Sequence, residues 1–109
     1  MLTLSAADVS GKWSGNVTAP GGEITTGYFD LRQTGEELSG TAGPSAQTQW
    51  PIRKGSIRGT KLEFEVAMPD QGVMRFDLTV EGERIQGEMS LVKGGEVQET
   101  SRIAVSRVR

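Results

Sequence analysis

The sequence predicts an all-β fold, an eight-stranded antiparallel up-and-down β-barrel, from three observations. Apolar residues recur at every second position through most of the chain, which is the period of a strand with one buried face. Turn signals containing Gly or Pro separate these runs at steady intervals. One strand-turn-strand pattern occurs twice. No window has helical periodicity of useful length, so we expect no long helix.

The turn signals divide the chain into eight expected strands, which are residues 11–18, 23–33, 36–42, 48–58, 61–68, 73–80, 84–92 and 96–108. Within each of the first three strands, the apolar side chains occupy alternate positions, so they share one parity, either odd or even residue numbers. Trp13 and Val17 share a parity in the first strand, Phe29 and Leu31 share one in the second, and Leu38 belongs to the third. These positions define the expected inward face.

The other five strands alternate in the same way. Trp50 and Ile52 share a parity in the fourth strand, and KLEFEVAM is a clear fifth strand because its apolar and charged residues alternate. The segments MRFDLTV and RIQGEMSL repeat the pattern in the sixth and seventh strands. In the last strand we expect Val97, Ile103 and Val105 to point inward.

The repeated pattern is F-D-L-x-x-x-G-E-x-Φ-x-G, where Φ is an apolar residue, and it starts at Phe29 and again at Phe76. Its first glycine, Gly35 or Gly82, suits a hairpin turn that needs a positive φ. Its second, Gly40 or Gly87, falls inside the return strand, where a barrel wall bends sharply. Shared hairpin chemistry explains the repeat more simply than internal duplication.

Closing the sheet removes the two unpaired edges that eight consecutive antiparallel strands would otherwise leave. A two-sheet sandwich is the alternative. The inward apolar side chains are numerous enough to fill a short barrel almost completely. We therefore expect any ligand cavity to be small, or to open at one mouth.

Composition excludes several classes of function. The 109 residues suit one domain, and the chain has no Cys and no His. Disulfides, Cys- or His-based metal sites and His-dependent nucleophilic catalysis are therefore excluded. The net charge of −2 provides no general attraction for nucleic acid or for an anionic membrane. We expect no cofactor, no nucleic-acid partner and no membrane role.

Carboxylates are the only plentiful acid-base groups. Asp30, Glu63, Glu65 and Asp77 have the parity opposite to the apolar residues, which puts them on the solvent face rather than in a catalytic cleft. We therefore expect the protein not to be an enzyme.

A second group of charges is basic. Arg53, Lys54, Arg58 and Lys61 form a run without an intervening carboxylate. Such a run could bind anions or acidic polysaccharides, but a solvated face is the simpler interpretation.

The start of the chain, MLTLSAAD, has the small and apolar character of the end of a secretory signal peptide, without a charged n-region. We expect residues 1–8 to be a disordered leader or an interdomain linker, and 9–109 to be one β-barrel domain. The leader interpretation predicts a secreted or periplasmic, extracytoplasmic protein.

Gly11-Lys12-Trp13 on the first strand, followed by Leu38-Ser39-Gly40-Thr41, resembles the calycin pattern of lipocalins and avidins. The resemblance covers about the first 42 residues by motif and implies a calycin, lipocalin-like barrel. It also implies that Trp13 lies across one barrel end beneath a basic side chain from the last strand. Alternation makes Arg107 the first candidate and Arg102 the second.

The resemblance does not extend to biotin binding. Avidin-type pockets use several Trp residues, whereas this chain has two, and Asn16 stands one residue later than the polar pocket residue of that family. A compact lipocalin-like domain of the kind found in secreted bacterial proteins is the better comparison.

Two functional hypotheses of different class follow. In the first, the barrel mouth binds a small apolar or amphipathic molecule, because large Met and aromatic side chains suit an adaptable pocket. Its expected ligand-binding residues are Trp50, Phe64, Met68, Met74, Phe76 and Met89. In the second, the domain is a ligand-free structural or protein-interaction module accessory to a secreted enzyme. The sequence favours the first hypothesis narrowly.

Overall fold

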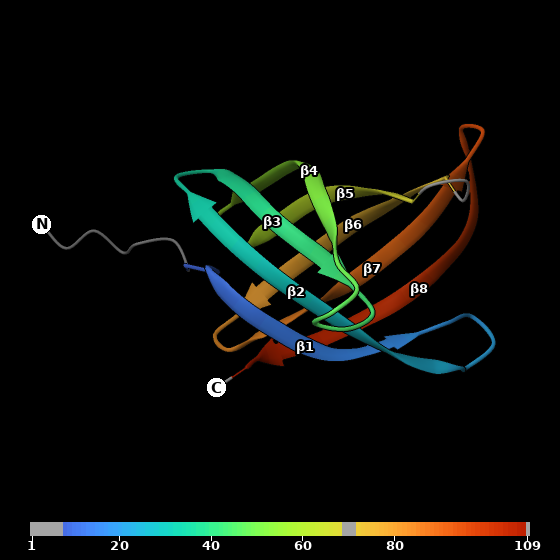
Figure 1. Ribbon diagram of the computed structural model, residues 1–109, viewed down its shortest axis with the longest axis horizontal. Coiled ribbons are helices and arrows are strands. Elements are labelled where there is room, and N and C mark those ends of the chain that lie inside the picture. The colour runs from blue at the N-terminus through green and yellow to red at the C-terminus, as the bar shows by residue number, and fades with distance from the viewer. Residues whose placement is uncertain (1–7, 69–71, 109) are drawn as a thin grey trace, which may run out of the picture.

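A closed antiparallel barrel is formed by eight strands in the order of the chain (Figure 1). The structure is a computed structural model that describes residues 8–68 and 72–108. Its strands are β1 (Gly11–Thr18), β2 (Ile24–Thr34), β3 (Glu37–Gly43), β4 (Trp50–Arg58), β5 (Lys61–Met68), β6 (Gly72–Glu81), β7 (Arg84–Lys93) and β8 (Glu96–Arg107). The predicted fold class is confirmed, and each predicted strand is present with its ends shifted by at most two residues.

The barrel closes where β1 pairs with β8, the two strands farthest apart in the sequence. Their register places Trp13 opposite Arg107 and Val17 opposite Ile103. Every other pair of neighbouring strands is an antiparallel hairpin. The two-sheet sandwich is therefore wrong, because no strand of the barrel is left at an edge.

The core consists of the inward side chains that the alternation predicts. Phe29, Phe64 and Phe76 form its aromatic cluster. The rings of Phe64 and Phe76 stack with centroids 4.5 Å apart, and Phe29 meets both edge-on at 5.6 and 5.7 Å. These geometries are the ones that aromatic quadrupoles prefer. The hairpin of β5 and β6 therefore meets β2, a strand far from it in the sequence, in one packed layer.

The two copies of the repeated motif have the same geometry. Gly40 lies opposite Leu31, and Gly87 lies opposite Leu78. A Cβ on Gly40 would overlap the carbonyl oxygen of Asp30, and a Cβ on Gly87 would overlap that of Asp77. The second glycine of each copy is thus required because two backbones approach closely.

The prediction that Val97 points inward is wrong, because its side chain is 60% exposed. Leu91 pairs with Glu99, but the next residue, Val92, pairs with Val97, so β8 contains one extra residue, Gln98, at this point. This bulge reverses the alternation beyond it. Val97 consequently shares the outer face with Val92 instead of pointing inward.

One end of the barrel is closed by Trp13 and the residues around it. Trp13 is fully buried, and its Nε1 donates to the carbonyl oxygen of Val9 at 2.9 Å. The Arg107 guanidinium lies over the ring, 4.4 Å from its centroid. The expected contact between Trp13 and Arg107 is confirmed, so Arg102 does not occupy this position.

Arg107 also fastens the N-terminal segment to this end. It donates to the carbonyl oxygens of Ser10 and Asp8 at 2.8 and 2.9 Å, and its Nε lies 3.1 Å from a Glu83 carboxylate oxygen. Asp8 belonged to the expected leader or linker, residues 1–8, and the remainder of that segment lies outside the described residues. A hydrogen bond from the Ser10 backbone N–H is the main cause that lowers the pKa of the Asp8 carboxyl.

Replacing Arg107 with lysine should loosen this end of the barrel. Lysine keeps the positive charge but lacks the planar guanidinium group, which donates to two carbonyl oxygens while it stacks on the Trp13 ring. We expect the free energy of unfolding to fall by about 1–2 kcal/mol. Amide exchange at Val9 and Ser10 should accelerate more than exchange in β5. Unchanged exchange at both residues would contradict the fastening role of Arg107.

Candidate functional site

The end of the barrel opposite Trp13 contains an apolar cavity of about 200 Å³. All eight strands contribute to its wall. Its lining residues are Val17, Thr25, Thr26, Gly27, Phe29, Ala42, Gly43, Pro44, Trp50, Val66, Met68, Met74, Phe76, Met89 and Ile103. The sequence-based expectation of a small cavity at one mouth agrees with this geometry.

The cavity exists because some wall positions carry little or no side chain. Gly27 lies in β2 within the run of alternating inward positions that includes Phe29, and Ala42 lies inward in β3. Both line the space that a larger residue would occupy. In contrast, Trp13 and the apolar residues near it fill the closed end. The difference between the two ends is therefore a difference in side-chain volume at inward positions.

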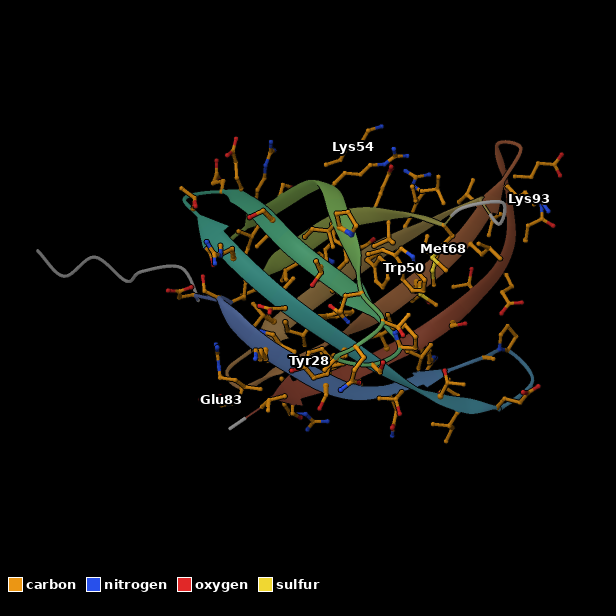
Figure 2. The ribbon with its side chains drawn as sticks, in the orientation of Figure 1. Tyr28, Trp50, Lys54, Met68, Glu83 and Lys93 are labelled. Atoms are coloured by element: carbon orange, nitrogen blue, oxygen red, sulfur yellow. The ribbon has the colours of Figure 1, made fainter. Side chains whose placement is uncertain are left out.

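Five of the six predicted site residues come together at this cavity. Trp50, Met68, Met74, Phe76 and Met89 all line it. Figure 2 shows Trp50 and Met68 close together where β4 and β5 reach the mouth, whereas Glu83 lies toward the closed end. The three methionines and Trp50 are only partly buried, which leaves part of each side chain accessible.

Phe64 is the exception and corrects the predicted site. It is 2% exposed and does not line the cavity. Its ring instead stacks on Phe76 and meets the edge of Phe29, both of which do line the cavity. Phe64 therefore supports the wall from behind. Its parity in β5 predicts the correct face, but parity carries no information about depth along the barrel.

The connection between β3 and β4 is held beside the mouth by Gln49. Its Nε2 donates to the carbonyl oxygens of Ser45 at 2.8 Å and Tyr28 at 3.1 Å. Its Oε1 accepts from the Thr41 hydroxyl at 2.7 Å. Trp50 follows directly in the chain, so these bonds help to position it. Gln49 was not identified from the sequence. The only feature of the sequence that could have indicated it is its position next to Trp50, an expected site residue.

The four charges of the basic run, on Arg53, Lys54, Arg58 and Lys61, are all exposed, as the simpler interpretation of a solvated face predicts. Lys54 has a φ of 55° and lies in a β4 bulge that leaves both Arg53 and Lys54 exposed. Arg53 Nε and Lys54 Nζ lie 3.8 and 3.9 Å from one Glu65 oxygen, and Arg75 Nε lies 3.8 Å from the other. The remaining two charges, on Arg58 and Lys61, flank the turn between β4 and β5.

The other carboxylates of the expected outer face are exposed there, as parity predicts; they are Asp30, Glu63 and Asp77. Among residues 8–68 and 72–108, no group of three or more carboxylates is arranged to hold a metal ion. Over the same residues there is no helix long and apolar enough to cross a membrane.

No protein-family model matches the chain, and no curated protein matches it. The cavity must therefore be interpreted from its own geometry.

Proposed function

We propose that the protein binds a small apolar or amphipathic molecule in the cavity at the barrel mouth. The observation that carries the proposal is the convergence of Trp50, Met68, Met74, Phe76 and Met89 on one partly open apolar space. A concave apolar space lined by aromatic and flexible side chains is the usual form of a small-molecule site.

The architecture adds support at the level of analogy. A closed barrel sealed at one end by a tryptophan beneath an arginine is what the calycin resemblance implies, and many calycins carry apolar ligands. We extend that comparison to a lipocalin-like domain as part of the same proposal. Because one fold serves many functions, the cavity rather than the fold is the stronger argument.

The alternative is a ligand-free structural or protein-interaction module. One observation favours it: a volume of about 200 Å³ lies below the roughly 300 Å³ at which usual ligand pockets begin. A cavity of about 150 Å³ is nevertheless enough for a benzene-sized molecule. The cavity volume therefore limits the size of a ligand but does not exclude ligand binding.

Titration with benzyl alcohol, octanoate and the neutral dye N-phenylnaphthylamine tests the proposal. Binding should be saturable and should change the fluorescence of Trp50, which lines the cavity. Trp50→Phe should abolish most of that change, because the remaining Trp13 is buried at the opposite end. If none of the three probes binds saturably, the ligand-free module is the correct alternative.

Filling the cavity should prevent binding. Val17 lines the cavity, and its neighbour Asn16 is exposed on the opposite face of β1. We expect Val17→Phe to weaken binding at least about tenfold by occupying the space, and Asn16→Phe to change it less than about twofold. Calorimetric titration of both folded variants measures the difference. Equal affinity for Val17→Phe and the unmodified protein would place the binding site elsewhere.

A further inference from the structure

We infer that the ligand of the mouth cavity is an uncharged molecule built around one rigid aromatic ring. This inference rests on the proposed function and narrows its ligand class. It excludes ionised amphiphiles such as fatty acids, which the sequence alone left open. Three properties of the lining carry it: the chemistry of its polar groups, its volume, and its content of sulfur and aromatic rings.

The first property is the absence of charge from the described lining. None of the fifteen described residues that form the wall is ionisable. Their side-chain hydroxyls belong to Thr25 and Thr26, which are both exposed. Thr25 lies opposite Val17 in the register, at the mouth end of β2. A hydroxyl can pair with an alcohol or carbonyl, but it offers an ionised carboxylate no compensating charge.

The second property is volume. About 200 Å³ is close to the space that holds one benzene ring with a small substituent, given that about 150 Å³ accepts benzene. A flexible chain of equal volume would have to lose several freely rotating torsions on entering the cavity. A rigid ring has no such torsions to lose, so more of the energy of its contacts with the wall contributes to the affinity. A compact space therefore selects for rigid ligands.

The third property is the composition of the wall. Met68, Met74 and Met89 come from β5, β6 and β7, three neighbouring strands, and Phe76 and Trp50 add aromatic surface. Methionine sulfur makes favourable contacts with aromatic rings, and aromatic pairs gain energy beyond the area that they bury. An aromatic ligand can make both kinds of contact, whereas a saturated ring of the same size makes neither.

Methyl NMR with three matched probes tests this inference. Benzyl alcohol and cyclohexylmethanol differ in aromaticity, and benzyl alcohol and benzoate differ in charge. In protein carrying ¹³C-methyl methionine, the Met68, Met74 and Met89 signals are assigned by replacing each residue with leucine. We expect benzyl alcohol to shift all three signals through its ring current, upfield for a methyl group over the ring face and downfield for one at the ring edge.

The inference also fixes the order of affinities. Cyclohexylmethanol should bind roughly three- to tenfold more weakly than benzyl alcohol, because the sulfur and ring contacts are lost. Benzoate should bind at least about tenfold more weakly, because its charge lies beside a wall that carries no compensating charge.

The possible failures are distinguishable. Equal affinity for benzyl alcohol and cyclohexylmethanol, or for benzyl alcohol and benzoate, overturns the inference about ligand class. Saturable binding of octanoate or N-phenylnaphthylamine without binding of benzyl alcohol also overturns it, and leaves the proposed function standing. Failure of every probe, including those two, overturns both.

Discussion

Replacing Trp13 with alanine should lower the free energy of unfolding by about 3–5 kcal/mol, the range for removing a large aromatic side chain from a core. The side chain is fully buried, so its removal leaves a cavity that the stiff barrel wall refills only in part. The Val9 carbonyl also loses the indole N–H that bonds to it at 2.9 Å. Arg107 loses the ring beneath its guanidinium.

Urea unfolding followed by circular dichroism measures this loss without depending on tryptophan emission. Trp50→Ala is the matched control, because the same side chain is removed from a partly buried position at the open end. We expect it to cost less than half as much. If Trp13→Ala does not fold, Trp13→Phe supplies a milder comparison. A loss below about 1 kcal/mol for Trp13→Ala would contradict the role of Trp13 as the seal of the barrel end.

Replacing Gly40 with alanine is the second change for which we expect a large effect, a loss of about 2–4 kcal/mol. Two causes contribute. The φ of Gly40 is +124°, which a residue with a Cβ adopts only under strain. The added Cβ would also overlap the Asp30 carbonyl oxygen, and backbone cannot move aside as a flexible side chain can.

Three other glycines separate these causes. Gly35 has a φ of +62° but open space around its missing Cβ, so Gly35→Ala should cost only the conformational part, about 1 kcal/mol. Gly21 has open space and no positive φ, so Gly21→Ala should change stability by less than about 0.5 kcal/mol. Gly87→Ala should resemble Gly40→Ala. Equal stability of the Gly40→Ala and Gly21→Ala variants would refute the close-approach argument.

Much of the barrel follows from local sequence, because the information needed is local. Alternation identifies which side chains of a strand share a face, and a glycine turn joins each strand to the next. The hairpins starting at Phe29 and Phe76 show this directly, since both copies of one motif adopt one geometry. The contact between Trp13 and a basic side chain of the last strand was implied by the calycin resemblance, and alternation from Ile103 and Val105 then selected Arg107.

The sequence predicted which side chains of the candidate site point into the barrel. It did not predict how far along the barrel axis each of them lies. Phe64 and Met68 share a parity in β5, yet Met68 lines the cavity while Phe64 lies buried behind it. Depth depends on how far each strand is staggered around the closed barrel, which is a property of all eight strands together. Gly27, which also lines the cavity, could not be predicted from the sequence for the same reason. A glycine leaves a cavity only where the side chains of the other strands do not fill the space beside it.

The sequence by itself determined the strands, the hairpin order, the inward face and the residue types available for chemistry, because these depend on a two-residue period and on turn residues. The tertiary structure alone decided three further features. The bulge at Gln98 turned Val97 outward, the β4 bulge left Arg53 and Lys54 exposed near Glu65, and the stagger of the strands decided which inward side chains line the cavity. Each depends on the register between strands, and register is settled only when both partners and the rest of the barrel are in place.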